Sequence, residues 1–239
     1  MGDEMIMTGI LLLKPGREKN MIKTVKIGKV YFREATVSQC GRQWRDRRNL
    51  CRALDALKKD GVYRLIWDRT AQIDQTVLAR GFLPVSHGKL MRALALPIAA
   101  QYMQEGWHLS VWCRAGSCGE LIRQLCGLYD SVEVNAVCGQ TMREILSDVG
   151  NAPALFERPC KGRLRLMFCK TGAYDRESPG ISVNLSGKGP ILPGEYGDVF
   201  VESMEELPYP QEFSTDICTV LWETDPMFLK KLKTIRLLP

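Results

Sequence analysis

The chain has 239 residues, of which 45% are hydrophobic and 25% charged, and its formal net charge at neutral pH is +6. These proportions are typical of a folded globular protein with one large domain or two small ones. No stretch is apolar over the roughly 18 residues that a membrane-spanning helix needs, so we do not expect a membrane partner.

The cysteines and the N-terminus together predict a compartment. Nine cysteines are scattered along the chain, whereas a secreted disulfide framework is usually short and even-numbered. The apolar run Met5–Leu13 follows Asp3 and Glu4, where a signal peptide has basic residues. We therefore predict a cytoplasmic protein with free cysteines.

The charges are unevenly distributed along the chain. Residues 1–100 hold 19 Lys and Arg against 9 Asp and Glu, whereas the stretch Glu195–Asp225 holds nine acidic residues and no Lys or Arg. This asymmetry indicates a basic face and an acidic face. The acidic stretch could bind a protein partner; the alternative is that the two halves attract each other within the molecule or are simply solvated.

The first 155 residues show strand and helix patterns in alternation. Periodicity and turn residues predict strands at Met5–Leu13, Thr24–Phe32, Val62–Trp67, Trp107–Cys113 and Ser131–Val137. Helices are predicted at Gln43–Asp60, with Trp44 pointing inward, at Ser86–Glu105, interrupted at Pro97, from Ser117 to Tyr129, and from Thr141 to Gly150. The alternation from Val62 to Gly150 is typical of right-handed crossovers and a parallel sheet.

The pattern becomes richer in strands after about residue 155. Strands are predicted at Arg163–Cys169, Ile181–Leu185, Val199–Glu202 and Ile217–Trp222, and a short helix runs from Asp225 to Lys233. We therefore predict an α/β fold, with a mostly parallel, Rossmann-like sheet in the first 150 or so residues and a β-rich C-terminal extension or lobe. The corresponding domains are residues 1–155 and 156–239, the second of which either continues the same sheet or stands alone.

The turn from Cys113 to Gly119 is the best local candidate for chemistry. A strand enters a glycine loop and a helix begins, so backbone N–H groups and the positive end of the helix dipole face whatever lies there. Such a position lowers the pKa of a cysteine, which makes Cys113 and Cys118 candidate nucleophiles. The alternative is a structural turn, in which Ser117 and Glu120 form a capping box and both thiols are packed.

The segment Cys113-Arg114-Ala115-Gly116 resembles, over fewer than a dozen residues, the catalytic loop of rhodanese-type sulfurtransferases and the phosphate loop of cysteine phosphatases. The resemblance implies a cysteine nucleophile with an anionic substrate. The phosphatase loop has Arg six residues after its Cys, where this chain has Gly119, and His before it, where this chain has Trp112. A bound phosphate would therefore lack its bidentate arginine.

We expect a small anionic ligand at the carboxyl ends of the strands. Its predicted contacts are Asp68, Ser86, His87, Lys89, Arg114, Gly116 and Ser117, with Cys113 or Cys118 as nucleophile if the protein is an enzyme. The alternative for Ser86–Lys89 is an exposed helix cap. The sequence identifies no cofactor, and the Cys113–Cys118 spacing is not that of a metal site.

The second functional hypothesis is a non-enzymatic module that binds nucleic acid or protein. Arg42, Arg45, Arg48 and Arg52 lie on one predicted helix with Trp44, so they could follow phosphates while the aromatic ring stacks on a base. No recognised nucleic-acid-binding motif accompanies them. The alternative is an ordinary solvated helix face.

Overall fold

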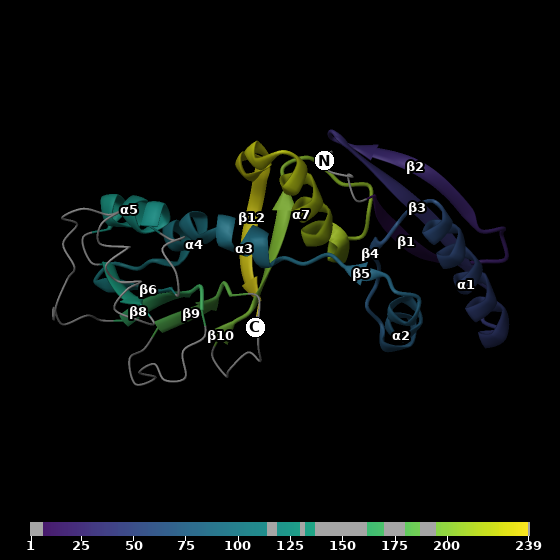
Figure 1. The fold of residues 1–239 in the computed structure, drawn as a ribbon, viewed down its shortest axis with the longest axis horizontal. Coiled ribbons are helices and arrows are strands. Elements are labelled where there is room, and N and C mark those ends of the chain that lie inside the picture. The colour runs from purple at the N-terminus through teal and green to yellow at the C-terminus, as the bar shows by residue number, and fades with distance from the viewer. Residues whose placement is uncertain are drawn as a thin grey trace. The chain divides into compact units, whose positions relative to one another are not determined.

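The fold was analysed in a computed structural model that describes residues 7–113, 119–129, 132–136, 162–169, 180–186 and 195–238. The chain forms two compact units (Figure 1). Unit 1 comprises residues 1–86 and 201–233, and unit 2 comprises residues 87–200 and 234–239. The junction predicted between residues 155 and 156 lies outside the described residues.

Unit 1 is built on a five-stranded mixed sheet. Its strands are β1 (Thr8–Pro15), β2 (Met21–Ile27), β3 (Val30–Gln39), β4 (Arg64–Ile66) and β5 (Leu83–Pro84), in the order β2-β3-β1-β4-β5. All neighbouring pairs are parallel except the edge pair β2 and β3, which is antiparallel. The single strand predicted at Thr24–Phe32 was wrong, because the chain reverses there at Gly28, whose φ of 57° suits glycine.

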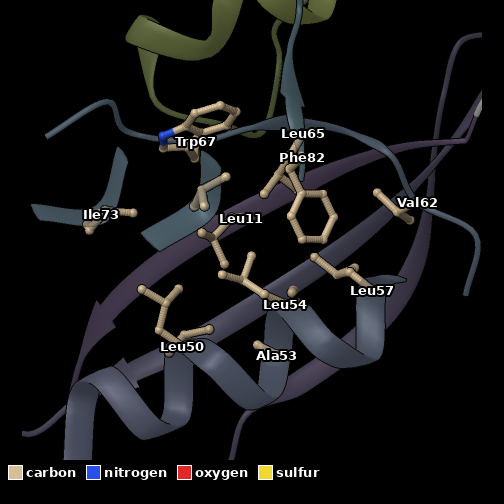
Figure 2. Packing of buried hydrophobic residues seen from close by; sticks show 13 residues of the cluster. Leu11, Leu50, Ala53, Leu54, Leu57, Val62, Leu65, Trp67, Ile73 and Phe82 are labelled. Carbon is tan, nitrogen blue, oxygen red and sulfur yellow. The ribbon is translucent and has the colours of Figure 1, made fainter. Parts of the chain in front are cut away.

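Two helices pack on one face of this sheet, and Figure 2 shows the buried side chains between α1 and the strands. Helix α1 (Gln43–Lys59) confirms the helix predicted there, while α2 (Ala71–Ala79) was not predicted. The shared core holds Leu50, Ala53, Leu54 and Leu57 of α1 against side chains of β1, β3, β4 and α2. The inward orientation predicted for Trp44 was wrong, since this side chain is 61% exposed.

The other chain segment of unit 1 contributes helices. The strand predicted at Ile217–Trp222 was wrong, because this stretch lies in α7 (Ser214–Thr224), where Ile217, Val220 and Leu221 recur at helical spacing and are buried. The 3₁₀ helix η2 (Gln211–Phe213) precedes α7. A second one, η3 (Pro226–Lys231), forms the short helix predicted after Asp225, whose carboxylate accepts from the Met227 N–H.

Unit 2 holds a separate five-stranded sheet in which all strands are parallel. Its strands are β6 (Trp107–Cys113), β7 (Val132–Ala136), β8 (Gly162–Met167), β9 (Gly180–Asn184) and β10 (Glu195–Tyr196), in the order β10-β9-β8-β6-β7. The prediction of one parallel sheet in the first 150 residues therefore needs correction. The chain forms two sheets, and three strands from beyond residue 155 complete the second.

Three described helices accompany this sheet: α3 (Gly88–Ala93), α4 (Ala95–Tyr102) and α5 (Gly119–Leu128) (Figure 1). The interruption predicted at Pro97 occurs instead at Leu94, between α3 and α4. Pro97 lies in the first turn of α4, where its missing N–H has no intrahelical partner to lose, so it does not break the helix.

A two-stranded sheet completes the fold, formed by β11 (Asp198–Ser203) and β12 (Leu232–Leu238). Hydrogen bonds from Gly197 N to Leu238 O and from Met204 N to Lys231 O show that the two strands are antiparallel. Within the described ranges, no helix is both long enough and apolar enough to cross a membrane.

Candidate functional site

A cavity of about 1160 Å³ lies in unit 1 at the carboxyl ends of its parallel strands. Leu13 and Pro15 of β1 and Val37 and Gln39 of β3 line its floor, and the segment after β4 contributes Asp68. The four strand residues are in register as two cross-strand pairs on the face that α1 and α2 cover. The carboxyl edge of a parallel sheet is where open α/β folds place their ligands.

The N-termini of two helices border this cavity. Gly41, Gln43 and Arg47 line it from the start of α1, and Thr70 and Ile73 line it from the start of α2. The first N–H groups of any helix have no intrahelical acceptor, and neither N-cap residue here, Arg42 or Thr70, offers a side-chain cap. Both first turns therefore present N–H donors and a positive dipole end at one cavity.

Some charged side chains of the lining are engaged in contacts within the protein, whereas another can bind a ligand. Asp46 Oδ1 accepts from the Cys40 N–H at 2.8 Å, and this bond is the main reason that the pKa of Asp46 is lowered. Arg80 Nε contacts Asp55 Oδ1 at 3.2 Å. Arg47 is exposed, and no ion pair to it is found among the described residues, so its guanidinium is available to an anion.

The residues predicted to form one anion site are distributed over both units. Asp68 lines the cavity of unit 1, whereas Ser86, at the end of that unit's first segment, is not among its lining residues. His87 and Lys89 belong to unit 2, where His87 Nδ1 lies 2.8 Å from Asp198 Oδ1. Arg114, Gly116, Ser117 and Cys118 lie outside the described residues.

The candidate nucleophile Cys113 is the last residue of β6, and its side chain is fully buried. A structural cysteine whose thiol is shielded from solvent is generally unreactive. Burial therefore favours the packed-thiol alternative for Cys113, and its catalytic role stays a prediction. The six described cysteines, Cys40, Cys51, Cys113, Cys126, Cys169 and Cys218, are not in disulfides.

The predicted basic helix is α1, and its arginines face water. Arg42, Arg45, Arg48 and Arg52 are exposed, and the structure records no ion pair for them with any described residue, including those of the acidic stretch Glu195–Asp225. Arg45 lies over the ring of Trp44, with 5.2 Å between Cζ and the ring centroid.

This arrangement is unfavourable for the helix itself. Positive charges near a helix N-terminus each cost roughly 0.3–1 kcal/mol, because the dipole is positive there. The like-charged pair Arg48 and Arg52, four residues apart, costs a few tenths more, about 0.2–0.5 kcal/mol. Asp46 in the first turn of α1 offsets part of these costs, because its negative charge is favourable at a helix N-terminus.

Sequence reasoning did not identify a polar row that crosses the sheet of unit 2. Glu133, Ser110, Arg165, Ser182 and Glu195 are neighbours in register on five adjacent strands, and the last four are almost fully buried. The alternation of arginine and leucine along β8 was its signal in the sequence.

The row extends along β8 to Arg163. Arg163 Nη1 contacts Glu133 Oε2 at 3.1 Å, while its Nε is buried and has no hydrogen-bond partner among the residues that the structure describes.

Comparison with known proteins gives no further guidance. No family model, no curated protein and no solved structure matches this chain.

Proposed function

We propose that unit 1 binds an anion that carries phosphate, in the cavity at its strand ends. The observation that supports this most directly is the meeting of two uncapped helix N-termini and Arg47 at one cavity. Backbone N–H groups at a helix start, together with the dipole, form a general anion site. The guanidinium of Arg47 adds a fork that matches phosphate oxygens.

The rest of the lining favours a ligand that also carries hydrogen-bond donors. Gln39, Gln43 and Gln75 offer amide groups, and Asp68 offers a carboxylate that accepts but repels a second anion. The cavity is somewhat larger than the roughly 300–1,000 Å³ of a typical small-molecule site. A nucleotide, with phosphate at one end and N–H donors on its base, fits both properties.

The sharpest test is Thr70→Asp at the N-cap of α2. Thr70 has extended backbone angles (φ −70°, ψ 141°) that suit an N-cap. A carboxylate there would accept from the first-turn N–H groups and so occupy the position of the ligand's phosphate. We expect the variant to be more stable by up to about 1 kcal/mol, yet to bind AMP or inorganic phosphate at least tenfold more weakly by calorimetry.

Two further variants separate the site from general charge effects. Arg47→Ala should weaken the binding of AMP, because it removes the lining guanidinium. Lys59→Ala removes the same charge from the far end of α1, outside the cavity, and should leave binding unchanged. The proposal fails if neither AMP nor phosphate binds at millimolar concentration, or if Thr70→Asp binds as tightly as the wild type.

A further inference from the structure

We infer that the phosphate-bearing ligand of unit 1 is a single-stranded nucleic acid. One nucleotide occupies the cavity, and the phosphates that follow run along the outer face of α1. The inference rests on the proposed function, because it takes the cavity as the place where the first nucleotide is held. What it adds is the class of ligand and a second surface.

The cavity lining and the outer face of α1 are continuous. Arg47 lines the cavity, and Trp44 and Arg48 lie three residues before it and one after it. Residues three and four positions apart are neighbours on a helix, so Trp44 is adjacent to both Arg47 and Arg48 on the surface of α1. Arg48 in turn adjoins Arg45 and Arg52, which lie three residues before it and four after it.

The exposed ring of Trp44 offers this face a surface on which a base can stack, which the arginine charges alone do not provide. The side chain is 61% exposed, and the Arg45 guanidinium lies over the ring. Proteins that bind single strands combine a basic track with aromatic rings on which bases stack. Trp44 stands between the cavity and the outer arginines, where a second base would lie if the first were in the cavity.

The cavity favours a single-stranded ligand over a duplex. A base that is paired within a duplex cannot enter a pocket unless it is first flipped out, whereas an unpaired base enters freely. An acidic protein segment could satisfy the arginines, but it would leave the amide-lined cavity and the stacking face unused. The observations therefore favour an unpaired strand over both alternatives.

The test measures binding of fluorescein-labelled dT12 by anisotropy over a salt series. We expect dT12 to bind more tightly than AMP, and also more tightly than a dT12–dA12 duplex. The triple variant Arg45→Ala/Arg48→Ala/Arg52→Ala should lose three phosphate contacts. The slope of log K against log salt then becomes shallower by about 2, because each contact contributes about 0.7 for a single strand.

Trp44 is tested by paired substitutions in the same assay. Trp44→Ala should weaken the binding of dT12 by roughly 5- to 100-fold, the range that a base–aromatic stack is worth. Trp44→Phe should recover most of this loss, because phenylalanine keeps a stacking face. Neither substitution should change the affinity for AMP.

The charge control removes three lysines elsewhere in unit 1. Lys26→Ala/Lys230→Ala/Lys233→Ala lowers the net charge by the same three units at exposed positions outside α1. This control should keep the slope and most of the affinity for dT12. If it matches the arginine triple variant, binding reflects overall charge and the inference is overturned.

The remaining outcomes separate this inference from the function on which it rests. If AMP binds in the cavity and dT12 binds no more tightly than AMP, the proposed function stands and the inference fails. It also fails if the duplex or a poly-glutamate peptide binds α1 more tightly than dT12 does. If dT12 binds but AMP does not, the cavity site is refuted, and the inference fails with it.

Discussion

The bond between Tyr209 and Glu34 gives a sharp test of how the second chain segment of unit 1 is held on the first. The Tyr209 hydroxyl donates to Glu34 Oε2 at 2.7 Å, and Glu34 is only 5% exposed. Lys23 and Thr36 contact the other carboxylate oxygen, at 3.1 and 3.4 Å. Removing the hydroxyl therefore takes away the only donor recorded for Oε2 among the described residues.

The expected cost of Tyr209→Phe follows from these contacts. A hydrogen bond to a charged group contributes roughly 1.5–3 kcal/mol, and the ring, which phenylalanine retains, continues to pack. Tyr209 is itself only partly buried, so water can partly replace the lost donor and the lower half of this range applies. We expect the urea midpoint to fall without a change in the m-value.

The pH dependence of stability tests the same bond independently. Burial, and next the hydrogen bond and charge of Glu34, raise the pKa of Tyr209 above its ordinary value. The folded state thus keeps a proton that the unfolded tyrosine releases above about pH 10, so the wild type loses this stability as the pH rises beyond 10. The phenylalanine variant has no such proton. The difference in the free energy of unfolding between the wild type and Tyr209→Phe should therefore become smaller above pH 10.

The control is Tyr31→Phe, because Tyr31 is exposed and no acceptor for its hydroxyl is recorded among the described residues. Its stability should stay within about 0.5 kcal/mol of the wild type. The reasoning is refuted if Tyr209→Phe is as stable as this control at pH 7, or if the gap between Tyr209→Phe and the wild type does not narrow above pH 10.

Three further predictions concern packing, acid stability and thiol reactivity. A Cβ at Gly9 would lie within 2.9 Å of two core side chains, so Gly9→Ala should lower the free energy of unfolding in urea by about 1–3 kcal/mol. The control is Gly127→Ala, which adds a Cβ in open space on a helix and should raise the free energy of unfolding by up to about 1 kcal/mol. Equal effects of the two substitutions would contradict the packing argument. The pKa of Asp46 is lowered, chiefly by the Cys40 N–H. Its contribution to stability is therefore present above the unfolded pKa near 3.9 and is lost as the pH falls. In melting curves between pH 5 and 2, Asp46→Asn should lose less stability than the wild type does. Fully buried Cys113 should react with iodoacetamide far more slowly in the native protein than Cys40 does, and fast alkylation with a pKa well below 8.5 would restore it as a nucleophile.

The sequence predicted the type of location at which the candidate site lies, but not the segments that form it. The sequence indicated anion binding where strands end and helices begin, and Asp68 does line such a cavity. It pointed first to Cys113, however, because a glycine turn next to cysteine is visible locally. The cavity instead uses Arg47, Gln39 and Thr70, which come from three separate segments. No local pattern joins these segments, because only the parallel register of β1, β3 and β4 brings them to one edge.

The outward position of Trp44 illustrates the same limit. Helical spacing showed which residues share a face with Trp44, but it did not show where the buried stripe begins. The stripe is set by Leu50, Leu54 and Leu57, which contact the sheet, and it leaves Trp44 in solvent. The side of a helix that faces the core depends on what packs there, and tertiary structure alone supplies that.

The sequence by itself determined the elements whose periodicity is strong and whose ends are marked. Helix α1 and strand β6 lie where they were predicted, because their apolar spacing and the glycines or turns beside them act within a few residues. Tertiary structure decided that Ile217–Trp222 is helical, that two sheets form instead of one, and that residues 201–233 join the first 86. The physical reason is that a short apolar run is compatible with either a strand or a helix, and its choice depends on partners far away in the chain.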